Sequence, residues 1–297
     1  MFAKAYQTAS KFTFPVVVLA RYFDATIEAG VGSFIFVNDE GWFLTAAHIF
    51  NFQQLQASQM PHIQNYTQQH TAITSQTDLS PDEQQKLLAQ IPYEPKWISN
   101  NSLWWGFDQL IVDQLFVLKE NDLALGRLAN FNSAMCAAFP VFKHPANLAN
   151  ATSLCKLGFP FHEIKAEFDL AGNNFRLQEG VLPIPRFPLE GIFTRNIDAG
   201  KTPDNKFNIK YIETSTPGLR GQSGGPIFDV SGRVWAIQSQ TVHIPLGFSP
   251  SLNVNGTMVQ ENQFFNVGYG VHIETILAFM DAHNVAYQMS EEEEIIA

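Results

Sequence analysis

The sequence of 297 residues contains only two cysteines, Cys136 and Cys155, too few for a disulfide framework. A core without cross-links must be held together by packing, which is typical of proteins from reducing compartments. Together with the lack of a convincing signal peptide, this favours a cytoplasmic location but leaves secretion open.

Charged residues are also scarce, at 15% of the chain, and the basic ones are outnumbered. The 18 Lys and Arg against 28 Asp and Glu leave a net charge of −10. Nucleic-acid-binding proteins usually present a basic face, so we expect no nucleic-acid partner. Four of the acids form the run 291–294, which we interpret as a solvated tail.

Long apolar runs are missing as well. The longest early one, residues 14–20, is far too short to cross a bilayer, so no membrane span is expected. Lys4 and Lys11 precede it, and it could pass for the centre of a secretion signal. Because Arg21 follows at once and no small-residue cleavage site is evident, we interpret the run as a first strand.

Phenylalanine is abundant, with 26 copies, and short runs rich in Phe, Val and Ile alternate with Gly, Pro and Asn. This pattern predicts many short strands. It is interrupted at about residues 51–106, a Gln-rich region where Ser80 and Pro81 are typical of a helix start. The passage 140–150, rich in Pro and Asn, separates two β-rich halves, and residues 267–285 predict a strand followed by a closing helix.

The stretch LRGQSGGPIF (219–228) places three glycines and a proline around Ser223. A serine hydroxyl is a poor nucleophile until a base removes its proton, and a third group must hold that base in one tautomer. Of the eight histidines, only His48 ends a strand among small residues, in FLTAAHIF. Asp122 begins an apolar strand in ENDLALGRL, where a lone charge is costly without a partner. These three residues are therefore the candidate catalytic set.

Each member has an ordinary structural interpretation when taken alone. His48 could be a buried histidine with its hydrogen bonds satisfied, Asp122 a turn acid, and Ser223 part of an ordinary glycine-rich turn. Asp108 and Asp113 are rival acids, but neither begins an apolar strand. The other histidines lack the spacing of metal ligands, so no metal site is expected.

The frames TAAH, NDLAL and GQSGGP, in this order, resemble the chymotrypsin-like serine peptidases. Residues 219–241 are most similar to the protease domain of the bacterial HtrA/Deg type. The resemblance implies an all-β fold of two six-stranded barrels with the active site between them. Residues 1–135 would form the first barrel, with the helical insertion; residues 136–275 would form the second, and residues 276–297 a closing helix and the acidic tail.

The resemblance implies a serine endopeptidase that hydrolyses polypeptide substrates through an acyl-enzyme intermediate, without a cofactor. His48 would act as general base and then acid, Asp122 would orient its ring, and Ser223 would attack. The backbone N–H groups of Gly221 and Ser223 would bind the developing oxyanion.

The same resemblance locates the floor of a specificity pocket near Pro217, with Gly218 beside it. Neither is acidic, so a basic side chain would lack a counter-charge, and we expect an uncharged or apolar residue before the scissile bond. Gln238, Ser239 and Gln240 would bind the substrate backbone as an added strand.

The chain departs from the family at two points. Gln222 stands where secreted trypsin-like enzymes carry a carboxylate that pairs with a new N-terminus, so activation by zymogen cleavage is not expected. Too few residues follow the protease region in this sequence for the PDZ domain of the HtrA type, so we expect none here. Two other functions stay open: a catalytically silent binding or scaffold protein, and an esterase or self-processing enzyme with the same triad.

Overall fold

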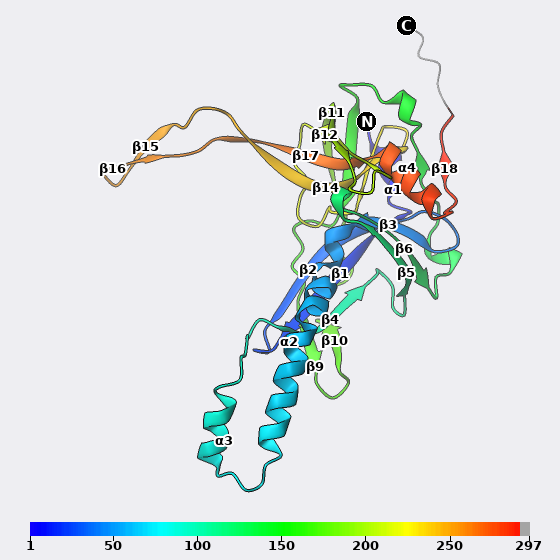
Figure 1. The fold of residues 1–297 in the computed structure, drawn as a ribbon. Coiled ribbons are helices and arrows are strands. Elements are labelled where there is room, and N and C mark those ends of the chain that lie inside the picture. The colour runs from blue at the N-terminus through cyan, green and yellow to red at the C-terminus, as the bar shows by residue number, and fades with distance from the viewer. Residues whose placement is uncertain (292–297) are drawn as a thin grey trace.

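The computed structural model describes residues 1–291, and two curled antiparallel sheets form its body (Figure 1). Apart from Glu291, the acidic run expected at 291–294 lies outside the described residues. The double-barrel fold that the sequence predicts is confirmed.

The first barrel contains six strands in the spatial order β4-β1-β2-β3-β6-β5, each antiparallel to its neighbours. Their bounds are β1 (Thr13–Tyr22), β2 (Ile27–Phe36), β3 (Trp42–Ala46), β4 (Ile98–Trp104), β5 (Ile111–Leu118) and β6 (Leu123–Ala129). Alternate apolar side chains fill its interior: the rings of Phe36, Phe43 and Trp105 each lie within 6 Å of the fully buried ring of Phe34.

The second barrel closes on itself, because β13 pairs with both β8 and β14 at the two ends of the order β13-β8-β11-β12-β17-β14. Its strands are β8 (Ser153–Gly158), β11 (Phe187–Lys201), β12 (Asn208–Thr214), β13 (Pro226–Phe228), β14 (Val234–Pro245) and β17 (Phe264–His272). The short strands β7 (Val141–Phe142) and β18 (Gln288–Met289) add to it in parallel.

Two antiparallel ribbons extend from this body. One consists of β9 (Ala166–Asp169) and β10 (Asn174–Leu177). The other prolongs β14 and β17 and ends in β15 (Ser251–Val254) and β16 (Thr257–Gln260), which project far from the barrels in Figure 1.

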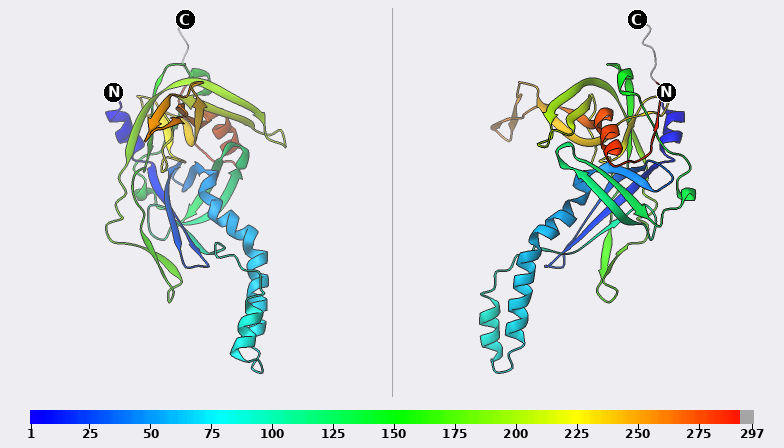
Figure 2. Two further views of the ribbon diagram at one scale, coloured as in Figure 1. Left: turned by 90° about the vertical axis from the view of Figure 1, so that its left-hand side faces the viewer. Right: turned by 45° about the vertical axis from the view of Figure 1, so that its right-hand side comes forward.

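The helical insertion is shorter than the sequence predicts. Helices α2 (Asn51–Thr74) and α3 (Pro81–Leu88) form a hairpin that projects from the first barrel in both views of Figure 2. As expected, Ser80 caps α3: its side chain accepts from the backbone of Glu83, whose carboxylate bonds back. Residues 98–104, which we assigned to the insertion, are instead strand β4, paired with β1.

Two further helices flank the second barrel. Helix α1 (Ala3–Ala9), which the sequence did not predict, lies against β13. Helix α4 (Ile273–Ala282) is the expected closing helix and packs against strands of both barrels, β6, β12, β14 and β17. Within residues 1–291, no helix is both long enough and apolar enough to cross a membrane.

Candidate active site

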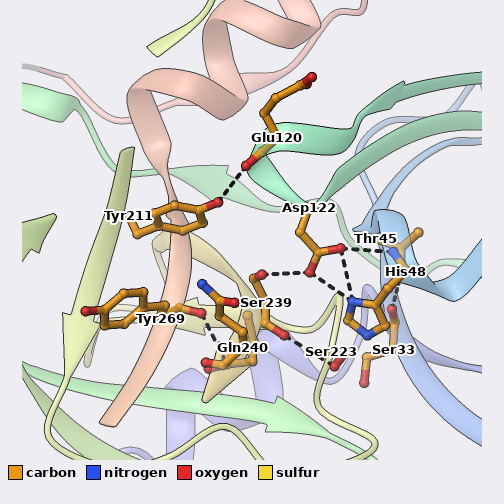
Figure 3. Close-up of polar contacts among 11 residues, drawn as sticks. Ser33, Thr45, His48, Glu120, Asp122, Tyr211, Ser223, Ser239, Gln240 and Tyr269 are labelled. Atoms are coloured by element: carbon orange, nitrogen blue, oxygen red, sulfur yellow. Dashed lines mark hydrogen bonds and ion pairs between the residues drawn. The ribbon is translucent and has the colours of Figure 1, made fainter. Parts of the chain in front are cut away.

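The three candidate catalytic residues meet where the barrels face each other (Figure 3). His48 lies in the single 3₁₀ turn η1 (Ala47–Phe50) that follows β3. Asp122 follows the turn η2 (Lys119–Asn121) and precedes β6, so both come from the first barrel. Ser223 comes from the second barrel, in the connection between β12 and β13.

The carboxylate of Asp122 is the centre of the hydrogen-bond network. Nδ1 of His48 lies 3.0 Å from Oδ1 and 2.9 Å from Oδ2, and the backbone N–H of His48 donates to Oδ1 at 2.9 Å. The hydroxyl of Ser239, on β14 of the second barrel, donates to Oδ2 at 2.7 Å. An ionised carboxylate only accepts, so Nδ1 must carry the proton, which leaves Nε2 of His48 as the basic nitrogen.

Asp122 is held in an unusual backbone conformation, with φ 53° and ψ 42° in the left-handed region. Its carbonyl accepts the N–H of Ala47 at 3.1 Å, and the neighbouring buried Asn121 donates to the carbonyl of Asn208 at 3.0 Å. The hydroxyl of Tyr211 donates to Glu120 O at 2.9 Å, and burial together with the Asp122 charge raises the pKa of Tyr211 to about 12. These hydrogen bonds on both sides of Asp122 hold it in a conformation that would otherwise be unfavourable.

The backbone of Ser223 is held by a short hydrogen bond, whereas its hydroxyl makes only one long hydrogen bond. Its carbonyl accepts the N–H of Ser33 at 2.8 Å, while its Oγ reaches Ser239 O only at 3.5 Å. Among the hydrogen bonds of residues 1–291, none joins Ser223 Oγ to His48, although both line a pocket of about 260 Å³. Catalytic hydrogen bonds often become short only when substrate binds, so this geometry suits a resting enzyme.

The two expected oxyanion donors are the backbone N–H groups of Gly221 and Ser223. The carbonyl of Gly221 accepts from Phe159 N–H at 2.9 Å and from Ser33 Oγ at 2.8 Å, so residues of both barrels bind it. Within the described chain, neither Gly221 N–H nor Ser223 N–H donates a hydrogen bond, and both residues line a second pocket with His48. Buried N–H groups are rarely left unpaired, so these two are available to a ligand.

The glycines are required by geometry. Gly221 has a φ of +102°, and a Cβ there would lie 2.5 Å from Phe159 O. At Gly224, with a φ of +83°, a Cβ would collide with the carbonyl of Ser33. Any side chain would therefore strain the turn that presents Ser223.

Gln222 has a structural part in the same turn. It is fully buried; its Oε1 accepts the N–H of Leu219 at 3.0 Å, and its Nε2 donates to Phe187 O at 3.4 Å. The Gln222 amide therefore holds the loop before Ser223 in place through these two hydrogen bonds. Secreted trypsin-like enzymes carry a carboxylate at this position, which pairs with the new N-terminus.

The pocket beside Ser223 is formed by Gly218 to Arg220 on one side and by β14, from Gln238 to Thr241, on the other. Four of the five expected substrate-binding residues line it: Gly218, Gln238, Ser239 and Gln240. Pro217 is not among its lining residues. The side chain of Gln238 lies across the base of the pocket, where Nε2 donates to Gln240 O and Tyr269 O, each at 3.1 Å.

Lys156 is a residue that the sequence analysis missed. It comes from β8, is 1% exposed, and directs Nζ to the carbonyls of Pro217, at 3.0 Å, and Thr216. Burial lowers its pKa to about 7. The signal in the sequence was a single lysine inside the apolar strand TSLCKLGF (152–159).

The rival acids are engaged elsewhere. Asp108 accepts from the indole of Trp104 at 3.0 Å, and Asp113 accepts from Arg127 Nε at 3.1 Å. Among the described residues, no group of three or more His, Cys, Asp or Glu side chains could hold a metal ion.

Comparison with known proteins identifies the family. The model of the trypsin-like peptidase domain matches residues 32–237, more than half of the chain, so this protein belongs to the trypsin-like peptidase family. A comparison with curated protein sequences found no match.

A search of solved structures found proteases, with TM-scores just below 0.5. The Rv3671c protease from M. tuberculosis in its active form is 9% identical, with a TM-score of 0.49, over 96% of this chain and 86% of that one. The HtrA-type protease AlgW with a tripeptide is 14% identical, with a TM-score of 0.48, over 96% of this chain. This chain spans 65% of the length of AlgW.

Proposed function

We propose that this protein is a serine endopeptidase that uses His48, Asp122 and Ser223 as its catalytic residues. The observation that carries the proposal is the Asp122 carboxylate, which binds Nδ1 of His48 at 2.9 Å and the Ser239 hydroxyl at 2.7 Å across the barrel interface. This contact leaves Nε2 as a base at the edge of the pocket that Ser223 lines. Membership in the trypsin-like peptidase family supports the same reaction.

In the proposed reaction, Nε2 of His48 takes the Ser223 proton while Oγ attacks the carbonyl carbon of the scissile bond. The oxyanion accepts hydrogen bonds from the N–H groups of Gly221 and Ser223. His48 then donates its proton to the leaving amine, which departs and leaves an acyl-enzyme. Water, deprotonated by His48, attacks the ester, and Ser223 regains its proton as the product acid leaves.

The substrate backbone would bind along β14. This strand pairs with β13 only as far as Ile237, so beyond Gln238 one edge has no partner strand among residues 1–291. An extended peptide can add to such an edge through main-chain hydrogen bonds. A basic side chain before the scissile bond is disfavoured, because no Asp or Glu lines the pocket and the ammonium of Lys156 lies behind it.

A fluorophosphonate probe, followed by digestion of proteome-derived peptides read by mass spectrometry, tests the proposal. The wild-type protein should be labelled at Ser223 and should cleave peptide bonds, whereas Ser223→Ala should lose labelling and about a millionfold in turnover. The control Ser58→Ala, on the exposed surface of α2, should behave like the wild type.

Each alternative has its own result. A folded wild-type protein that the probe does not label would be a silent binding or scaffold protein. Labelling at Ser223 without cleavage of any peptide would favour an esterase. Cleavage confined to a bond within the chain itself would indicate a self-processing enzyme.

A further inference from the structure

Lys156 lies directly behind the wall of the pocket beside Ser223. Its Nζ donates to Pro217 O at 3.0 Å and to the hydroxyl of Thr216 at 3.4 Å. A Cβ added to Gly268 would collide with Nζ and lie 3.0 Å from the N of Gly218, so these atoms are immediate neighbours. Gly268 pairs in turn with Thr241 of the pocket.

The cation has no carboxylate partner among the ion pairs of residues 1–291. Glu213, on the neighbouring strand β12, is already bound by Arg195 at 2.8 Å. Carbonyl oxygens alone compensate a buried ammonium incompletely, and burial lowers the pKa of Lys156 to about 7. The charge therefore favours a negative group that enters the pocket.

A second positive charge, that of Arg220, lies at the pocket itself. Arg220 lines it and is exposed, while no Asp or Glu is among the lining residues. The hydroxyl of Thr241 donates to Gly218 O at 2.6 Å and keeps the base polar. A purely apolar side chain would meet little apolar surface here, whereas a carboxylate would lie in front of the buried ammonium of Lys156 behind the wall.

We propose that the pocket beside Ser223 selects an acidic side chain, Glu or Asp, immediately before the scissile bond, and that Lys156 sets this preference. The proposal rests on the peptidase function proposed above. It replaces, within that function, the uncharged or apolar residue that the sequence predicts: Lys156 is more than 50 residues from the pocket segments in the chain and adjoins them only in the folded barrel.

Glutamine is the competitor that a test must separate from glutamate. The carboxamide oxygen of Gln238 has no hydrogen-bond donor among the described residues and would accept from a substrate amide. Glu and Gln have nearly the same shape, so the ratio of their kcat/KM values isolates the charge. An acidic side chain that raises the pKa of Lys156 by one unit would be favoured about tenfold.

The first measurement compares peptides that differ only in the residue before the scissile bond: Glu, Asp, Gln, Ala and Lys. For the wild type we expect a Glu/Gln ratio of at least about ten. For Lys156→Met, the ratio should fall to about one or below. If Lys156 merely held the carbonyls of Thr216 and Pro217, all five peptides would lose rate together and the ratio would not change. Lys165→Met, which removes an exposed lysine, should keep the wild-type ratio.

The second measurement needs no variant and therefore does not depend on its folding. Selection of a carboxylate requires the ammonium, so the wild-type Glu/Gln ratio should fall as the pH rises from 6 to 9.

The other charged groups near Lys156 do not mimic this change. Burial raises the pKa of Glu213, but the hydrogen bonds from Arg195 and Thr194 outweigh it and lower that pKa overall. Burial and Glu213 raise the pKa of Tyr269 on β17. Glu190, which pairs with Cys155 from β11, is exposed.

Failure of this proposal is distinct from failure of the proposed function. A protein that the fluorophosphonate probe does not label contradicts the peptidase itself. A labelled protein that cleaves after Gln or Ala as fast as after Glu, or whose ratio is independent of pH, overturns the acidic preference alone.

Discussion

At the scale of single residues, the candidate site depends on the Asp122 carboxylate and the Gly221 backbone, both of which are held in place by several hydrogen bonds. Asp122 accepts from His48 and Ser239 at the same time, and these partners come from different barrels. Gly221 is constrained as strongly: its φ is +102°, its carbonyl accepts from Phe159 and Ser33, and its own N–H donates no hydrogen bond within residues 1–291. The motif GQSGGP thus reflects the backbone conformation that the turn around the Ser223 hydroxyl requires.

Replacement of Gly221 by alanine should show whether the position of its N–H affects activity beyond the effect of backbone strain. Gly221→Ala places a methyl 2.5 Å from Phe159 O, so the turn must shift and kcat/KM should fall by about 10²–10³-fold. Gly200→Ala is the matched control, because Gly200 has a similar φ of +93° but no atom within 4 Å of the new methyl. Gly200→Ala should lose about 1 kcal/mol of stability from backbone strain alone, and Gly221→Ala should lose more because of its contact with Phe159. Equal activity of the two would remove Gly221 N–H from the mechanism.

At the scale of elements, the α2–α3 hairpin has an attached base and a free tip. Near its base, Gln56 Nε2 donates to the carbonyls of Ile98 and Ser99 at 3.1 and 3.0 Å, and Ile98 N–H donates to Gln59 at 2.9 Å. The rings of Tyr66, Tyr93 and Trp97 pack together farther out. No residue of α2 or α3 is fully buried, so the hairpin is held to β4 mainly by these polar contacts.

Two truncations of the α2–α3 hairpin should therefore have different effects on the stability of the protein. A short linker in place of residues 69–90 should leave the unfolding transition cooperative and the midpoint nearly unchanged, because loop closure depends weakly on length. The longer replacement of residues 54–90 also removes the contacts of Gln56 and Gln59 and should cost about 2–4 kcal/mol, at about 1 kcal/mol per hydrogen bond. Denaturant unfolding followed by circular dichroism measures both. Equal midpoints would show that these glutamines contribute nothing to the first barrel.

At the scale of the whole molecule, one apolar core connects the two barrels. The largest buried cluster includes Phe34 and Leu125 of the first barrel together with Phe228 and Val271 of the second. Helix α4 adds Ile276 to the same cluster. The barrels should therefore unfold together, and the junction that α4 covers should control the stability of both.

His272 makes this junction sensitive to acid. It is 1% exposed, and its Nδ1 accepts the N–H of Glu274 at 3.1 Å as the N-cap of α4. Burial, and then the charge of Lys210, lower its pKa from 6.5 to about 4. A lowered folded-state pKa means that the unfolded chain binds the proton first, so stability present above pH 6.5 is lost as the pH falls toward 4.

The expected loss from this one group is about 3 kcal/mol between pH 6.5 and 4. His272→Asn keeps a side-chain acceptor for the cap but cannot titrate, so its free energy of unfolding should fall less over this range. His62→Asn, an exposed position on α2, is the control and should follow the wild type. Parallel pH curves for wild type and His272→Asn would mean that the buried imidazole does not contribute to acid unfolding.

The sequence by itself determined what depends on neighbours along the chain. The short apolar runs predicted the strands, Ser80 and Pro81 predicted the start of α3, and the three motifs in order predicted the double barrel and the candidate residues His48, Asp122 and Ser223. These features are local because turns, caps and the glycines around a nucleophile are set within a few residues.

Only the tertiary structure decided what depends on barrel closure. Residues 98–104 became strand β4 because β1 offered them an edge, and their own polar sequence, ISNNSLW, did not predict a strand. Lys156 came to lie behind the pocket wall because β8 pairs with β13 and its lysine reaches Pro217 and Gly268, segments far away in the chain. A charge acts through space, so the effect on the substrate that we propose for Lys156 could not be inferred until the fold had brought these segments together.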